Sequence, residues 1–349
     1  MALPCWRSPA ALAIRHFTTS AYRARPSIPY IETCPSPTCS CATPPPDLDI
    51  DRKSPLLNTM AFYSSHVLVC TGKEDWSSRI EDDGGEGGDF IRGLKGIVGK
   101  GGEAFDPFNN IMATASSFPA ATKPSTTDLL LFPSFKRING LSNDRDTLST
   151  FATAFLKAKR LHPFHNDLAP EQQKVLMRDD SVASSLPPTT PITTPTILIC
   201  GHGGRDQRCG VMGPILRDEF RKQLEKKGIQ GDVGLISHIG GHKYAGNAIL
   251  YLPPTSSKAI SQTPASSSTD VDVQETGLAG SGIWYGRVDP LHVEGIVEET
   301  IVSGRIIADL FRGGITKEGA NLGRMLEEQM AKEKGEDGGL KLKPKARRP

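Results

Sequence analysis

Runs of apolar residues bounded by glycine, proline or polar clusters predict two α/β units in this chain. In the first half, residues 66–71 (HVLVCT) and 129–132 are expected to be buried strands. Apolar positions within 148–156 share one helical face and predict a helix. Residues 83–102 contain nine glycines and are expected to form a loop. Together these elements predict an N-terminal α/β domain over residues 61–162.

The second half carries a longer series of predicted elements. A helix is expected from about Met212, because apolar residues recur every four positions, Pro214 falls in the first turn and Gly228 follows the end. A second helix is expected over residues 290–303. Short β-branched or apolar runs predict strands over 196–200, 233–237, 248–252 and 283–285. A mixed sheet with helices follows, for which a thioredoxin-like layout over residues 196–315 is the nearest common architecture.

Polar segments separate and flank these units. Residues 32–60 are rich in proline and serine and predict a linker, and residues 163–195 predict a second linker. Residues 254–281 are rich in serine and threonine and are expected to be a disordered insertion between two strands. Residues 316–349 predict a helix followed by a basic, solvated tail.

The first 31 residues have the composition of a mitochondrial presequence. Arginines are spaced along residues 1–31, and no acidic residue precedes Glu32. Residues 15–20 (RHFTTS) resemble a two-step matrix-processing pattern. We therefore expect import into the mitochondrion, in the matrix rather than the intermembrane space, with the import machinery as a partner. The alternative is an arginine-containing N-terminus of no consequence.

Bulk composition excludes several classes of protein. The 349 residues are 37% hydrophobic, with 35 glycines and 27 prolines, so part of the chain is expected to be loop. A net charge of +2 does not indicate a nucleic-acid or membrane-surface binder, and no apolar run is long enough for a transmembrane span. Neither a P-loop nor a dinucleotide-binding fingerprint is present.

Cysteines and histidines converge on one candidate metal site. Cys200 and Cys209 bracket a glycine-rich loop between a predicted strand and helix, and His238 and His242 follow another strand with two glycines between them. Such loops let backbone approach a ligand closely. Two thiolates and two imidazoles suit a [2Fe–2S] cluster, and they suit tetrahedral zinc equally well. Buried cysteines beside a hydrogen-bonded histidine pair are the third interpretation.

Four segments resemble the sucrase/ferredoxin-like family of thioredoxin-like [2Fe–2S] proteins, and its mitochondrial branch in particular. They are CGHGGRDQRCG (200–210), SHIGGHKYAGN (237–247), WYGRVDPLHVEGIV (284–297) and LFRGG (310–314), and HVLVCTGKEDWSSRIE (66–81) adds a weaker match. The resemblance covers roughly residues 30–315 without the insertions. It implies a cluster with both imidazoles on one iron, loaded by the cluster-assembly machinery. The implied ligands are Cys200, Cys209, His238 and His242.

The residues around these ligands suggest how the site works. His202 lies in the same loop and is a possible competing ligand, although a role beside the cluster is expected. Three roles stay open for Arg205 and Arg208: they raise the potential, they dock an acidic partner, or Arg205 forms a local surface pair with Asp206. Gly240 and Gly241 are expected beside the cluster. Trp284 and Tyr285 are expected either to wall the site or to belong to the core.

The ligand set predicts a function in one-electron transfer or thiol redox control, with a redox protein of unknown identity as partner, rather than an enzyme. Imidazole ligands remove negative charge and raise the potential, and their second ring nitrogen allows electron uptake to be coupled to proton uptake. The alternatives are a structural zinc protein and a thiol oxidoreductase. The latter would use the early cysteines Cys34, Cys39 and Cys41.

Overall fold

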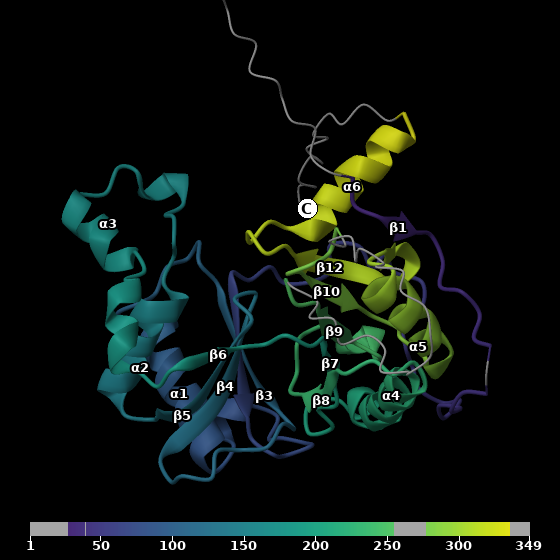
Figure 1. Cartoon of the computed structure of the whole chain (residues 1–349), viewed down its shortest axis with the longest axis horizontal. Helices are drawn as coiled ribbons and strands as arrows, with labels where there is room; N and C mark the ends of the chain where they lie inside the picture. The colour runs from purple at the N-terminus through teal and green to yellow at the C-terminus, as the bar shows by residue number, and fades with distance from the viewer. Residues whose placement is uncertain (1–26, 39, 255–276, 336–349) are drawn as a thin grey trace, which may run out of the picture.

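The computed structural model describes residues 27–38, 40–254 and 277–335, and its core is one mixed sheet shared by two halves of the chain (Figure 1). The N-terminal half contributes β2 (Ser65–Cys70), β3 (Ile111–Ser116), β4 (Thr126–Phe132), β5 (Lys136–Ser142) and β6 (Thr189–Pro191). The C-terminal half contributes β7 (Thr196–Cys200), β8 (Asp232–Ile236), β9 (Ala248–Tyr251), β10 (Gly282–Tyr285) and β12 (Phe311–Ile315). The predicted α/β class is confirmed.

The two halves repeat the same topology. The ten strands lie in the order β12-β10-β9-β7-β8-β3-β2-β4-β5-β6. In each half the first two strands are parallel, and the next two extend the sheet antiparallel from the first strand. The halves join between β3 and β8 through the single pair Ser116 and Ile236. Because β7 and β8 are parallel neighbours, the loops after Cys200 and Ile236 emerge at the same edge of the sheet.

Helices complete each half. The N-terminal half carries α1 (Glu86–Val98), α2 (Arg145–Phe151) and α3 (Pro170–Leu176). The C-terminal half carries α4 (Gln207–Lys226), α5 (Pro290–Ile296) and α6 (Leu322–Glu333). Helix α1 packs against β2, β3 and β4, and α4 packs against β7, β8 and α5. Both α2 and α5 continue into a π-helical turn, so the helix predicted over 290–303 is present with a change of pitch.

The loop predicted over residues 83–102 is wrong, because this segment contains α1. Phe90, Ile91, Leu94 and Ile97 form a buried stripe on this helix, so tertiary packing outweighs the helix-weakening effect of glycine. Glycine also permits close contact here. A Cβ on Gly93 would lie 2.7 Å from a methyl carbon of Leu148.

The predicted start of the helix near Met212 is also wrong. Helix α4 begins at Gln207, five residues earlier, and Asp206 caps it by accepting a hydrogen bond from the backbone N–H of Arg208. Pro214 therefore lies inside the helix rather than in its first turn. The earlier start places Cys209 within the first turn, where it faces the Cys200 loop.

Residues 27–38 and 40–60 form a strap against the outer side of the C-terminal half, drawn in purple in Figure 1. Ile28 is buried, and β1 (Tyr30–Ile31) pairs in parallel with β11 (Ile306–Ile307). The segment expected as a linker, 32–60, is thus largely irregular but attached to the folded body. The second expected linker, 163–195, contains α3 and β6. Residues 1–26, most of the predicted insertion (255–276) and the basic tail (336–349) lie outside the described residues.

A network of buried hydrogen bonds connects side chains of the N-terminal half to side chains of β9 and β10 in the C-terminal half. His66 of β2 contacts the Thr114 hydroxyl at 2.7 Å through Nε2 and the Tyr251 hydroxyl at 2.9 Å through Nδ1. The Tyr63 hydroxyl bridges Tyr251 at 2.7 Å and accepts a hydrogen bond from the indole N–H of Trp284 at 3.0 Å. Burial lowers the pKa of His66 to about 3, so its ring is neutral at physiological pH.

Candidate metal centre

The structure brings the four predicted ligands to one edge of the sheet. Cys200 is the last residue of β7 and is 1% exposed, and Cys209 lies fully buried in the first turn of α4. His238 follows β8 by two residues, and His242 begins a 3-10 turn that ends at Tyr244. The two strand ends and the helix start are the elements that position these side chains.

Paired glycines allow α4 to pack directly on the loop that follows Cys200. A Cβ on Gly213 would lie 2.5 Å from the Cα of Gly201, and a Cβ on Gly210 would lie 2.6 Å from the Cα of Gly203. No larger residue fits at these contacts without moving the helix. This close approach brings the thiols of Cys200 and Cys209 into hydrogen-bonding contact.

The two thiols are electrostatically unequal. A hydrogen bond from Cys209 holds the pKa of Cys200 well below its usual value, with further contributions from His238 and the backbone N–H of His202. The shared proton and burial raise the pKa of Cys209. The start of α4 adds the positive end of a helix dipole. Negative charge is therefore favoured on Cys200, and the thiolate is the form that binds metal.

The histidines form a second pair beside the thiols. The ring centroids of His238 and His242 are 5.4 Å apart and their planes are inclined by 37°. Nδ1 of His238 is buried and has no hydrogen-bond partner among the described residues. A buried polar atom without a partner is costly in a folded protein. A metal bound at this nitrogen would satisfy it, so the donor set fits a metal group.

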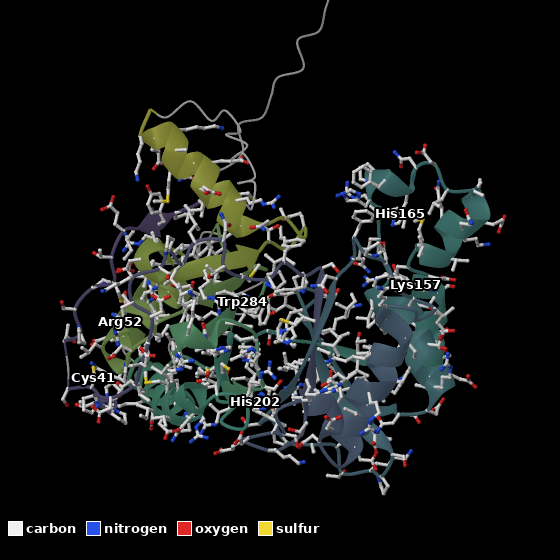
Figure 2. All side chains as sticks on the ribbon, turned by 180° about the vertical axis from the view of Figure 1, so that it is seen from behind. Cys41, Arg52, Lys157, His165, His202 and Trp284 are labelled. Carbon is white, nitrogen blue, oxygen red and sulfur yellow. The ribbon has the colours of Figure 1, made fainter. Side chains whose placement is uncertain are left out.

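His202 uses both of its ring nitrogens within the protein. Its Nδ1 accepts a hydrogen bond from the backbone N–H of His238 at 2.9 Å, which places the proton on Nε2. Nε2 in turn lies 3.0 Å from the carbonyl oxygen of Trp76 and 2.9 Å from that of Ser77. Figure 2 shows His202 at the junction of the two halves. It therefore positions the histidine loop and has no nitrogen left for a metal.

The two arginines of the loop differ from the predicted pairing. Arg208, not Arg205, forms the ion pair with Asp206, at 2.8 Å, and also donates to the carbonyl of Asp49 in the strap. Within the described ranges, the side chain of Arg205 donates one hydrogen bond, to the hydroxyl of Ser78 at 3.4 Å. The Arg205–Asp206 pair, one of the three roles left open, is wrong because the Asp206 carboxylate caps α4 and faces Arg208. Arg205 is left as the more available charge for a partner.

Other residues singled out in the sequence have structural positions. Trp284 and Tyr285 are fully buried in β10, which favours the core interpretation, and Trp284 lies inside the molecule in Figure 2. Gly240 and Gly241 both have positive φ, at 81° and 70°, which lets the histidine loop turn sharply. Cys34 is a half-buried free thiol whose pKa burial raises to about 12.

The described part of the chain contains neither a single-ion metal site nor a membrane-spanning helix. Within residues 27–38, 40–254 and 277–335, no group of three or more His, Cys, Asp or Glu side chains is arranged to hold one metal ion. The donors at the sheet edge come instead as a thiol pair and an imidazole pair. Across those ranges, no helix has both the length and the apolar character needed to cross a bilayer.

Two residues that the sequence patterns do not single out hold the two loops of the candidate metal centre from outside. Asp75 accepts hydrogen bonds from the backbone N–H of Gly204 at 3.0 and 3.1 Å, and Arg312 donates to the carbonyl of Gly240 at 3.1 Å. Both lie in segments that carry the family resemblance, GKEDW and LFRGG. For Arg312 the available signal was a charged residue inside an otherwise apolar and glycine-rich segment, whereas Asp75 stands in the charged run Lys73-Glu74-Asp75, which gives no such contrast.

Comparison with known proteins identifies one family, and the relatives reported below share one name. A family model described as sucrase/ferredoxin-like matches residues 56–313. A protein of Debaryomyces hansenii named altered inheritance of mitochondria protein 32 is 30% identical over 82% of this chain and 96% of its own length. Proteins of the same name from Meyerozyma guilliermondii (30% identical, 81% of this chain, 95% of the relative) and Clavispora lusitaniae (45% identical, 36% of each) also match. No solved structure matches.

Proposed function

Because the chain belongs to the sucrase/ferredoxin-like family, we propose that it is a mitochondrial [2Fe–2S] protein that transfers single electrons or controls thiol redox state. The proposed ligands are Cys200, Cys209, His238 and His242. The observation that carries this proposal is the buried Nδ1 of His238, which has no hydrogen-bond partner among the described residues and lies beside the hydrogen-bonded thiols of Cys200 and Cys209. The printed name of the relatives supports the mitochondrial part.

The protein's own groups favour electron uptake at this site. A [2Fe–2S] cluster takes two ligands on each iron, which suits donors presented as a thiol pair and an imidazole pair. The start of α4 and the backbone N–H of His202 direct positive charge toward Cys200. Neutral imidazoles in place of thiolates also raise the potential. We infer a carrier with a potential above that of four-cysteine ferredoxins. Proton coupling at the imidazoles stays a prediction.

A structural zinc site is the second candidate, because zinc accepts the same four ligands. The two proposals differ in colour, magnetism and metal content. We expect the anaerobically purified protein to be red-brown, to contain two irons per chain, and to give an EPR signal after one-electron reduction. A colourless protein with one zinc and no iron would contradict the cluster.

The third candidate, a thiol oxidoreductase using the early cysteines, has less support. A reactive cysteine needs a lowered pKa, whereas burial and the nearby acids Asp309 and Glu299 raise the pKa of Cys34 to about 12. Cys34 also donates to the carbonyl of His292, which holds it as a thiol. Neither Cys34 nor Cys41 belongs to a three-donor metal group in the described ranges. Cys39 lies outside them.

A further inference from the structure

Arg312 is a buried cation without an acidic partner in the described part of the chain. It lies in β12, is 1% exposed, and forms no ion pair with any described carboxylate. Burial lowers its pKa to about 10, which still leaves the guanidinium charged at neutral pH. A buried charge is expensive unless other groups compensate it. The surroundings of Arg312 therefore need an explanation.

The guanidinium holds the loop that carries the two histidines. Its Nη1 donates to the carbonyl of Gly240 at 3.1 Å and to Oδ1 of Asn247 at 2.7 Å. The amide of Asn247 then donates to the carbonyl of Gly241 at 3.0 Å. Both glycine carbonyls between His238 and His242 are thus fixed by one arginine and its neighbour. A side chain on Gly241 would collide with the guanidinium itself.

The rest of the guanidinium is anchored on the strap and on aromatic faces. Nε donates to the Thr59 hydroxyl at 3.1 Å, and Nη2 donates to the Thr59 carbonyl at 3.0 Å. The rings of Tyr244 and Trp284 lie 5.6 and 5.7 Å from its central carbon. These contacts are neutral, so they orient the cation without cancelling its charge. The arginine is locked in place but not neutralised.

Negative charge at the candidate metal centre acts on Arg312. The groups that raise the pKa of the guanidinium are Tyr244 first, and then the thiols of Cys200 and Cys209. One-electron reduction adds a negative charge at this centre. An oriented, water-excluded cation stabilises such a charge strongly, because the local dielectric constant is low.

Resting on the proposed function, we propose that Arg312 is both the positioning residue of the His238–His242 loop and the countercharge that stabilises the reduced metal centre. The two roles use different properties of the side chain. Positioning depends on the hydrogen bonds to Gly240 and Asn247, whereas the countercharge depends on the positive charge alone. Substitutions can therefore separate them.

The countercharge is tested by potentiometric titration of the iron-loaded full-length protein. R312Q removes the charge and should shift the reduction equilibrium at least tenfold toward the oxidised form, which is about 59 mV for one electron. R312K keeps the charge and should stay closer to the wild type. The matched control is R287Q, because Arg287 lies 5.2 Å from the same Tyr244 ring but is already paired with Asp51. Equal shifts in R312Q and R287Q would overturn the countercharge.

Positioning is tested without any metal, by deuterium uptake of the metal-free protein. R312Q and R312K should both raise uptake over residues 237–247 and leave β7 and the body of α4 unchanged. Uptake identical to the wild type, or a uniform rise across the whole chain, would overturn the positioning role. A wild-type protein that binds no iron would contradict the proposed function instead, and the uptake experiment would still decide whether Arg312 holds the loop.

Discussion

The backbone N–H of His238 donates to Nδ1 of His202 across 2.9 Å, so one histidine of the Cys200 loop fixes the start of the loop that carries two others. Through Nε2, His202 is tied to the carbonyls of Trp76 and Ser77 in the N-terminal half. The N-terminal half thus supports the candidate metal centre without supplying a ligand to it. This relationship ties the N-terminal half of the chain to a site whose four proposed donors lie in the C-terminal half.

Two substitutions of His202 separate its contacts. Asparagine places its side-chain oxygen near the position of Nδ1, so H202N should keep the bond from His238 and lose those to Trp76 and Ser77. Glutamine reaches the position of Nε2 and should do the reverse. Leaving the part-buried His238 N–H unpaired costs about 1 kcal/mol, so H202Q should retain less iron than H202N. Iron content per folded chain measures this. Equal iron content in the two variants would show that the His238 bond does not matter.

The ligand set makes a second prediction. C200S and C209S should lose the cluster, because a serine oxygen is a poor substitute for a soft thiolate. H238C and H242C should keep a cluster with a lower midpoint potential, because each returns a negative charge. Visible absorbance and potentiometric titration followed by EPR test both statements. A normally coloured C200S protein would remove Cys200 from the set.

A third prediction concerns processing of the N-terminus. Residues 27–31, inside the predicted presequence, hold the buried Ile28 and strand β1, and the Tyr30 hydroxyl donates to Glu333 at 2.6 Å. Import should therefore remove the chain only up to about residue 26. A chain starting at Ser27 should melt at the same temperature as the full-length protein, whereas one starting at Glu32 should melt several degrees lower. Mass spectrometry of the protein from isolated mitochondria locates the cut, and a mature N-terminus at Glu32 or later would contradict the prediction.

Local patterns predicted the elements that are buried on all sides. The strand over 196–200 matches β7 in both bounds, and the strand over 129–132 lies within β4, because continuous apolar runs leave few alternatives. Helix α1 was missed because its nine-glycine surroundings look like a loop, and only contacts with Thr71 and Leu148 show why glycine is used there. Such long-range contacts are absent from a local pattern.

The candidate site shows the same difference between local patterns, which the sequence reveals, and long-range contacts, which it does not. Spacing and strand ends were enough to group Cys200 with Cys209 and His238 with His242. The supporting residues could not be grouped in this way, since Arg312 is 65 positions from Asn247 and His202 is 126 from Trp76. The pairing of Arg208 with Asp206 depended on where α4 begins, and the sequence placed that start five residues too late.

The fourth prediction follows from the buried His66. In the folded protein burial lowers its pKa to about 3, whereas in the unfolded chain it returns to about 6.5. Between these values the unfolded state binds a proton that the folded state does not. The free energy of unfolding should therefore be independent of His66 well above pH 6.5. It should fall as the pH drops through 6.5, with a slope that approaches about 1.4 kcal/mol per pH unit.

The contribution of His66 is measured most clearly between pH 6.5 and 5, because carboxylates remain mostly ionised there in both the folded and the unfolded state. Denaturant unfolding at several pH values measures the slope, and H66Q is the matched variant, since glutamine keeps an amide for Thr114 or Tyr251 but does not titrate. Subtracting the H66Q profile removes the contributions of all other histidines. We expect the difference to rise toward neutrality by about 1 kcal/mol per pH unit over this window, because the limiting slope of about 1.4 kcal/mol per pH unit is reached only well below the unfolded pKa. Parallel profiles would mean that the folded protein admits a proton at His66, and that the junction between the two halves opens more readily than its buried network indicates.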